Sequence, residues 1–225
     1  MTQKFTILFD LDGTLVNTAP DLMNAHNYVM KKYGFKEKDL SAIKKLAGRG
    51  SKVMLARSLN DIAETEEFEN KIDEMTNEFI NYYSKNISKE STLKNGLLNF
   101  LSWCKDKSIS LGVCTNKQEH LSIDLLKKIK IYHFFEYVAG GDTFKHNKPH
   151  PRHLTDAIEV IGGSVKKTLM IGDSETDSNA SKAADIPFVL IKDGYTEKKS
   201  NEIYHDHLVK DFVGLEKIVE KYIDD

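Results

Sequence analysis

Apolar runs alternate with amphipathic stretches along much of the chain. Residues 5–9 ("FTILF") form the first apolar run, and from about residue 92 onward such runs recur between stretches with helical periodicity. The later runs are "ISLGVCT", "EYVAGGD", "KTLMIGD" and "PFVLIKDG". Continuous apolar strands separated by helices are typical of a parallel sheet that is covered on both faces. The pattern therefore predicts an α/β fold with a doubly wound parallel sheet.

The segment between the first strand and the later ones differs, because only helical patterns occur in it. Asn17 or Thr18 suits the N-cap of its first helix. A later helix carries an apolar stripe at 4-3-4 spacing that we expect to be buried, namely Phe68, Ile72, Met75 and Phe79. We therefore predict an all-helical domain over residues 17–89, inserted into an α/β core made of residues 1–16 and 90–225.

Composition narrows the class of protein. The 225 residues, of which 40% are hydrophobic, suffice for one domain or two, and the net charge of −2 gives no basic field for nucleic acid or anionic membranes. Cys104 and Cys114 lie in apolar contexts, so we expect buried free thiols. We expect no signal peptide, since the sequence as given leads directly into the first strand, and no apolar stretch reaches the roughly 18 residues of a membrane span. We expect a cytoplasmic monomer or homodimer.

Short polar or charged side chains follow the predicted strands. Because ligands of open parallel sheets bind beyond the carboxyl ends of the strands, these side chains should meet at one edge of the sheet. They are Asp10 and Asp12, Thr115 and Asn116, Lys148, and Asp173 with Asp177.

The chemistry of this set is coherent. Carboxylates and carbonyls suit Mg²⁺ better than zinc or copper. Lys148 and the Thr115 hydroxyl suit the oxygens of a phosphoryl group. A carboxylate beside a divalent cation can attack phosphorus and form an aspartyl-phosphate, and Asp12 could protonate the leaving oxygen and later deprotonate water. The set therefore predicts phosphoryl transfer.

Each feature also has a purely structural interpretation. "DLDGT" could be an Asp-Gly turn, "GDSETD" a capped helix N-terminus, and Thr115 with Asn116 the cap of the next helix. Arg49 stands between two glycines, where it could be aimed at the core site or simply be exposed. A cluster of histidines makes a transition-metal site conceivable, although the acidic set already accounts for a cation: His146, His150 and His153. Gly194, Tyr195 and Thr196 follow the last apolar strand and could border the site.

The motifs "DLDGT", "CTN", the lysine of "NKPHP" and "GDSETD", in this order, resemble the four signature motifs of the haloacid dehalogenase superfamily. The helical insertion is similar to the small helical cap of that superfamily. More narrowly, "FDLDGTLVNTAPDL", "GGDT" ahead of "KPHP" and "IGDSETDSNASKAADIP" resemble bacterial phosphoglycolate phosphatases. The resemblance implies a Rossmann-like core with an inserted cap.

The resemblance also implies roles for individual residues. Asp10 would be the nucleophile and Asp12 the general acid and base. Thr115 and Lys148 would hold phosphate. From the residues alone, Asn116 is a further candidate for phosphate contact, and Arg49 is the candidate for binding substrate from the cap. The implied Mg²⁺ ligands are Asp10, the backbone carbonyl of Asp12, and Asp173, with Asp177 nearby or ligating.

Three functions remain open from the sequence. The first is a Mg²⁺-dependent phosphomonoesterase for a small organic phosphate ester, with 2-phosphoglycolate as the leading candidate. The second is a phosphomutase similar to β-phosphoglucomutase, or a sugar phosphatase of broad specificity. The third is a non-catalytic phospho-sensor, which the second acidic pair in "GDSETD" and the large helical insertion oppose.

Overall fold

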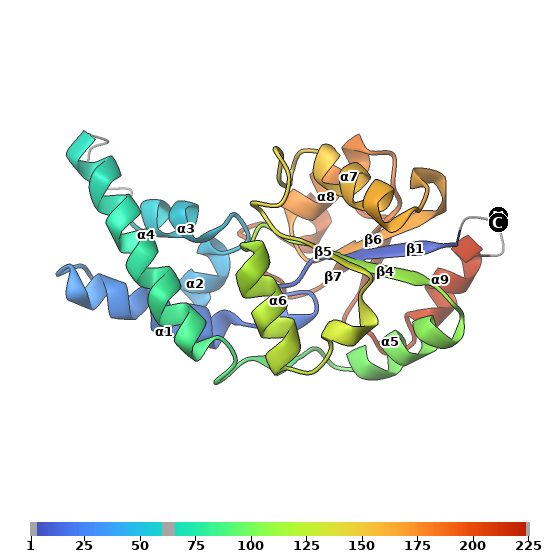
Figure 1. Cartoon of the computed structure of the whole chain (residues 1–225), viewed down its shortest axis with the longest axis horizontal. Coiled ribbons are helices and arrows are strands. Elements are labelled where there is room, and N and C mark those ends of the chain that lie inside the picture. The colour runs from blue at the N-terminus through green and yellow to red at the C-terminus, as the bar shows by residue number, and fades with distance from the viewer. Residues whose placement is uncertain (1–3, 60–65, 224–225) are drawn as a thin grey trace.

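A layered α/β core and a group of helices form the two ends of the molecule (Figure 1). The computed structural model describes residues 4–59 and 66–223, and of residues 66–69 it describes the backbone only. The first strand lies in the middle of the core, and the chain then enters the helical end before it returns to complete the sheet.

The core is built on a six-stranded parallel sheet with the order β5-β4-β1-β6-β7-β8. Its strands are β1 (Thr6–Phe9), β4 (Ser110–Cys114), β5 (Tyr137–Ala139), β6 (Thr168–Gly172), β7 (Phe188–Ile191) and β8 (His207–Val209). In the register of the three central strands, Phe9 lies beside Val113 and Ile171. These strands therefore end at the same level, and the residues that follow them meet at one edge.

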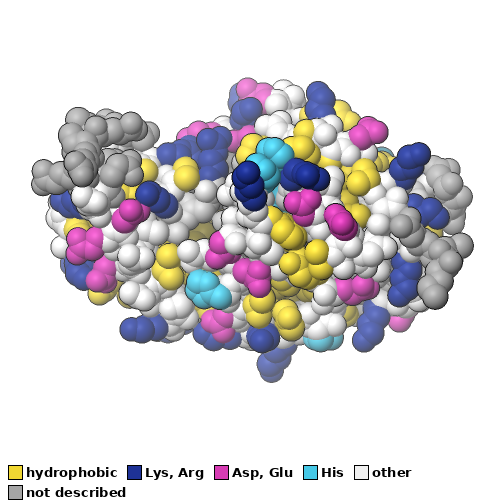
Figure 2. Space-filling model, turned by 45° about the horizontal axis from the view of Figure 1, so that its top comes forward, with side chains coloured by type: hydrophobic (Ala, Val, Ile, Leu, Met, Phe, Trp, Pro, Cys, Tyr) yellow, Lys and Arg dark blue, Asp and Glu magenta, His cyan; other side chains and the backbone are white. Residues whose placement is uncertain are grey.

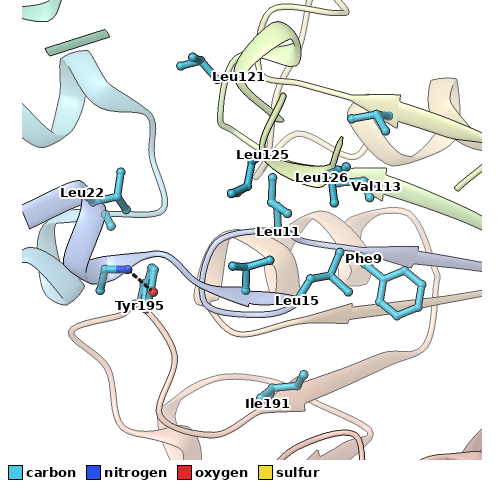
Figure 3. Close-up of a cluster of buried hydrophobic side chains, with 14 of the residues drawn as sticks. Phe9, Leu11, Leu15, Leu22, Val113, Leu121, Leu125, Leu126, Ile191 and Tyr195 are labelled. Carbon is cyan, nitrogen blue, oxygen red and sulfur yellow. Dashed lines mark hydrogen bonds between the residues drawn. The ribbon is translucent and has the colours of Figure 1, made fainter. Parts of the chain in front are cut away.

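Helices cover both faces of this sheet, as predicted. One face carries α5 (Leu97–Asp106), α6 (Glu119–Lys128) and α9 (Glu216–Ile223), and the other carries α7 (Arg152–Ile161) and α8 (Glu175–Ala183). The side chains of β1 alternate between the two: Phe9 packs with Phe100 and Phe212, whereas Leu8 belongs to the cluster of Met170 and Phe188. Figure 3 shows the first of these clusters extending past the end of β1.

In its described residues, the inserted part, which we call the cap, consists of four helices: α1 (Ala19–Lys32), α2 (Leu40–Leu46), α3 (Ser51–Ser58) and α4 (Glu66–Asn86). Ile72, Met75 and Phe79 of the predicted stripe are buried on α4, and the side chain of Phe68 lies outside the described residues. The buried face of α1 contributes residues such as Val29 and Met30 to the same core. Burial of facing apolar stripes thus holds the cap together.

Several elements differ from the sequence-based expectation. Short strands β2 (Val16–Asn17) and β3 (Thr92–Leu93) pair antiparallel where the chain crosses between core and cap. The edge strand β8 was not expected, because its three residues carry little apolar signal. Thr18 is the N-cap of α1 but makes no side-chain capping bond, since its hydroxyl donates to Asp12 instead. Single-turn 3₁₀ helices span Tyr132–Phe134, Val165–Lys167 and Ser200–Glu202.

The surface carries charges of both signs. Figure 2 shows acidic and basic side chains interspersed over one face, with hydrophobic side chains between them. Among residues 4–59 and 66–223, no helix is both long and apolar enough to cross a membrane. Cys104 and Cys114 are free and buried, as predicted.

Candidate active site

Three carboxylates and one ammonium group meet at the carboxyl edge of the sheet. Lys148 Nζ lies 2.6 Å from an oxygen of Asp10 and 2.6 Å from an oxygen of Asp177. Asp10, Asp173 and Asp177 each present a carboxylate oxygen, and these oxygens lie within 4.8 Å of one another. All four side chains are buried. The structure thus brings together the residue after β1, the loop before α7, the residue after β6 and the first turn of α8.

The loop after β1 is shaped by close packing against Asp173. Gly13 has φ +88°, and a Cβ atom at this position would lie 2.1 Å from Asp173 Oδ2. Glycine is therefore required for both the backbone conformation and the space. The next residue, Thr14, donates its hydroxyl to Asp173 Oδ1 at 3.0 Å. Tyr195 holds the other oxygen through its backbone N–H at 2.6 Å.

Asp177 is fixed by the start of α8. Its Oδ2 accepts from the Ser174 hydroxyl at 2.7 Å and from the Ser174 backbone N–H at 3.1 Å, in a capping box. Its Oδ1 is the atom that contacts Lys148. The structural interpretation of "GDSETD" therefore holds, because Asp177 completes a capping box at the start of α8, and the same side chain faces the acidic cluster.

Burial of this cluster changes its proton affinities. Burial raises the pKa of Asp10 to about 6, against the lowering effect of Lys148. Burial and the nearby Asp10 and Asp177 raise the pKa of Asp173 well above its ordinary value. The pKa of Lys148 is also raised, since its two carboxylate partners outweigh the effect of burial. The charge of Lys148 balances one of these three carboxylates, so ionisation of all three requires further positive charge.

The donor set fits a divalent cation. Buried carboxylates are costly unless positive charge compensates them, and the set contains hard oxygen donors without imidazole or thiolate. Oxygen donors of this kind are those that Mg²⁺ prefers. Asp10, Asp173 and Asp177 are three of the four residues that the sequence analysis names as candidate metal ligands, and Asp12 is the fourth.

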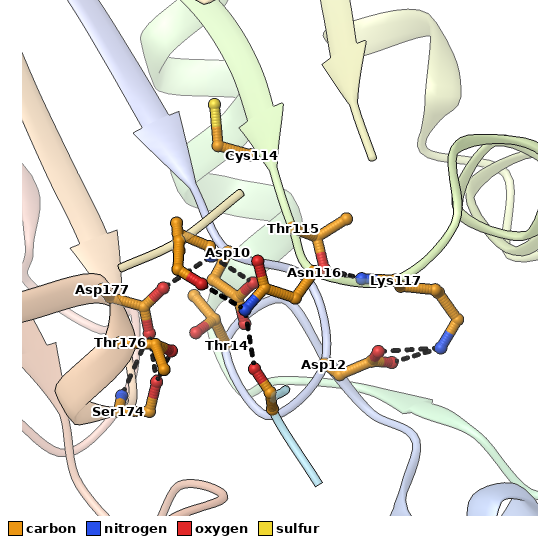
Figure 4. A network of polar contacts seen from close by, with 12 residues as sticks. Asp10, Asp12, Thr14, Cys114, Thr115, Asn116, Lys117, Ser174, Thr176 and Asp177 are labelled. Atoms are coloured by element: carbon orange, nitrogen blue, oxygen red, sulfur yellow. Dashed lines mark hydrogen bonds and ion pairs between the residues drawn. The ribbon is translucent and has the colours of Figure 1, made fainter. Parts of the chain in front are cut away.

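Asp12 lies apart from that cluster. Both of its carboxylate oxygens contact Lys117 Nζ, at 2.7 and 2.8 Å, and one of them accepts from the Thr18 hydroxyl at 2.6 Å. Figure 4 shows Asp12 turned toward Lys117, while Asp10 and Asp177 face each other on the other side. We expect Asp12 to coordinate a metal only through its backbone carbonyl, so its side chain does not act as a metal ligand.

Thr115 and Asn116 begin the loop after β4. The Thr115 hydroxyl accepts from the backbone N–H of Lys117 at 3.2 Å. The Asn116 amide donates to the carbonyls of Lys148 at 2.9 Å and of Gly48 at 3.0 Å, so it joins two core loops to the cap. The side-chain carbonyl oxygen of Asn116 is buried and has no hydrogen-bond partner among the described residues.

Arg49 extends from the cap to the core, where its guanidinium contacts Glu175 at 3.2 Å. Although burial of Glu175 acts in the opposite direction, hydrogen bonds from Thr196 and Arg49 lower the pKa of this carboxyl. A second ion pair between cap and core joins Arg57 to Glu197 at 2.9 Å. The segment after β7 thus contacts the cap.

A cavity of about 380 Å³ lies between cap and core. Asp10 and Asp12 line it from the core, and Arg49, Phe79 and Tyr83 line it from the cap. Its size suits a small organic molecule.

The three clustered histidines do not converge on one point. His146 and His150 stack with ring centroids 4.0 Å apart, whereas His153 is fully buried and its ring faces the Ala139 carbonyl at 3.4 Å.

Sequence reasoning did not identify Thr14 or Lys117 as site residues. The available signal was their position within "DLDGT" and directly after "CTN".

Comparisons with known proteins agree with one another. A family model described as haloacid dehalogenase-like hydrolase matches residues 7–191. The phosphoglycolate phosphatase of Agrobacterium fabrum is 36% identical over 219 residues, which cover 95% of this chain and 94% of that protein. A crystal structure from Haemophilus somnus, described as a predicted phosphoglycolate phosphatase, superposes with a TM-score of 0.86 at 29% identity, covering 97% and 99% of the two chains. A β-phosphoglucomutase from Clostridium difficile shares the fold, with a TM-score of 0.79 at 23% identity over 98% of each chain.

Proposed function

The chain belongs to the haloacid dehalogenase-like hydrolase family, and on that premise we propose that this phosphoric monoester hydrolase acts on 2-phosphoglycolate through an aspartyl-phosphate intermediate. Mg²⁺ is the proposed cofactor. The substrate assignment is supported by the names of the curated relatives and by the small cavity that cap and core enclose.

The observation that carries the mechanism is the position of Asp10. Its carboxylate lies at the carboxyl end of the central strand, lines the cavity, and is held by Lys148 at 2.6 Å. An Asp10 oxygen would attack phosphorus, and the bond from phosphorus to the ester oxygen would break. Lys148 would neutralise charge on the phosphoryl oxygens, where most of the catalysis of phosphoryl transfer resides. The Thr115 hydroxyl and the Asn116 amide are proposed to orient the same group.

Asp12 is proposed as the general acid and base. Asp12 lines the same cavity as Asp10, and its carboxylate lies outside the carboxylate cluster proposed to hold the metal. It would protonate the leaving ester oxygen and then take a proton from the water that attacks the aspartyl-phosphate. This second attack releases phosphate and restores Asp10.

Asp10, Asp173 and Asp177, with the Asp12 backbone carbonyl, are the proposed ligands of Mg²⁺. The cation would supply positive charge to the transferring phosphoryl group. Thr14 and the backbone of Tyr195 hold Asp173 in its orientation.

A screen of phosphorylated metabolites with Mg²⁺, read out as phosphate release, tests this function. We expect 2-phosphoglycolate to have the highest kcat/KM, and Asp10→Asn protein prepared in parallel controls for contaminating phosphatases. A sugar phosphate that ranks far above it would contradict the substrate assignment. Formation of an isomeric sugar phosphate in place of free phosphate would indicate a mutase instead.

A further inference from the structure

Lys117 is a buried cation at the contact between cap and core. It lies in the loop after β4, and its ammonium group binds both oxygens of Asp12 at 2.7 and 2.8 Å. The same group lies 4.5 Å from the ring centroid of Tyr83, on cap helix α4. Lys117, Asp12 and Tyr83 all line the cavity. The ammonium group of Lys117 is therefore bound jointly by a carboxylate of the core and an aromatic ring of the cap.

The other cations around the cavity are placed differently. Arg49 pairs with Glu175 and Lys52 pairs with Asp73, and their side chains are 48% and 50% exposed. The side chain of Lys117 is only 6% exposed. Because charge interactions strengthen as water is excluded, Lys117 is the lining cation best placed to bind a substrate anion strongly.

Resting on the function proposed above, we infer that Lys117 binds the carboxylate of the substrate. Asp12, once it has taken up a proton from solvent, delivers that proton to the ester oxygen, so that oxygen must lie next to Asp12 during the reaction. In 2-phosphoglycolate the carboxylate carbon is two bonds from the ester oxygen. A cation already bonded to Asp12 is therefore within reach of that carboxylate.

This arrangement couples substrate binding to the release of Asp12. Lys117 has three N–H donors, and both oxygens of Asp12 currently occupy its ammonium group. A substrate carboxylate that accepts from Lys117 takes over part of this pairing. Asp12 can then turn from Lys117 toward the ester oxygen. A phosphate ester without an anion at this position leaves Asp12 paired with Lys117, so the ion pair also selects the substrate.

The test compares two esters that differ only at this group. 2-Phosphoglycolate carries the carboxylate, and 2-hydroxyethyl phosphate replaces it with a neutral hydroxymethyl group while keeping an alkoxide leaving group. In Lys117→Met, we expect the kcat/KM for 2-phosphoglycolate relative to that for 2-hydroxyethyl phosphate to fall about thirtyfold or more. This is the effect of losing one partner of a desolvated charge pair, which costs about 2 kcal/mol at the lower end. Lys117→Arg, which keeps the charge, should retain part of the preference. If the methionine variant does not fold, Lys117→Gln gives the same comparison.

Arg49→Met is the comparison variant, since Arg49 is a lining cation of the cap and the candidate for binding substrate on sequence grounds. A general disturbance of Asp12 or of the fold slows both esters alike and leaves the ratio unchanged, which would overturn the inference. The inference would also be overturned if the ratio of the two kcat/KM values falls in Arg49→Met but is unchanged in Lys117→Met. If the wild type prefers 2-phosphoglycolate and Lys117→Met keeps that preference, the role of Lys117 is refuted but the substrate assignment stands. A wild-type enzyme without that preference overturns the substrate assignment as well.

Discussion

Thr14→Val should weaken the activation of the enzyme by Mg²⁺ without altering the shape of the site. The Thr14 hydroxyl donates to Asp173 Oδ1 at 3.0 Å, and both side chains are buried. Valine fills nearly the same space but presents a methyl group to that oxygen. Asp173 then keeps the backbone N–H of Tyr195 on its other oxygen and loses its side-chain donor.

The size of the effect follows from this single contact. A hydrogen bond to a charged group contributes about 1.5–3 kcal/mol. That range corresponds to roughly 10- to 150-fold in an equilibrium constant. Loss of a group that orients a metal ligand typically lowers metal affinity by about 10–100-fold, which is consistent. We therefore expect the Mg²⁺ concentration for half-maximal activity to rise at least about tenfold.

Two measurements check this prediction: phosphate release as Mg²⁺ is titrated, and the rise in melting temperature that Mg²⁺ causes without substrate. Thr14→Ser keeps the hydroxyl and should behave as the wild type does. Thr18→Val is the matched control, because that hydroxyl binds Asp12 outside the carboxylate cluster, and it should not shift the Mg²⁺ dependence. A half-activating concentration for Thr14→Val within twofold of the wild type would refute the reasoning.

Three further predictions follow from the same geometry. Asp10→Asn should abolish turnover, yet in EDTA at pH 7.5 it should melt above the wild type. Burial raises the pKa of Asp10 to about 6, so folding is penalised as pH rises from about 4 to 6, and the advantage of asparagine should shrink as the pH falls and be lost below about pH 3.5; a constant difference in melting temperature would contradict this. Asp12→Asn should give a burst of phosphoenzyme with an activated aryl phosphate and then very slow turnover, because hydrolysis of the intermediate loses its base; absence of a burst would assign Asp12 another role. Ca²⁺ titrated against fixed Mg²⁺ should inhibit phosphate release, since Ca²⁺ takes more ligands and often binds both oxygens of a carboxylate; turnover with Ca²⁺ equal to that with Mg²⁺ would argue against an Asp10 nucleophile.

The family assignment could be made from short motifs at strand ends. Apolar runs fix where the buried strands lie, and parallel strands bring their carboxyl ends to one edge. The positions of Asp10, Lys148, Asp173 and Asp177 near one another follow from this rule, and the structure brings them together. The family match and the fold confirm the predicted doubly wound core with a helical cap. The boundaries of the two domains and the roles of individual residues remain predictions.

The strand elements that were missed have little local signal. β2 and β3 contain two residues each, and β8 contains three with mixed exposure. Such strands form because a partner strand is already in place, as β7 is for β8. Hydrophobic periodicity needs a longer window to be recognised.

Tertiary structure alone decided which way each charged side chain turns. Asp10 and Asp12 are separated by one residue, yet Asp10 faces Lys148 whereas Asp12 faces Lys117 and Thr18. Lys117 is one of the many basic residues in the sequence, and its proposed role depends on a cap helix that places Tyr83 next to its ammonium group. Strand ends are determined by local apolar patterns, which a sequence displays directly. The partners of long side chains depend on how distant segments pack, and that packing exists only in the folded molecule.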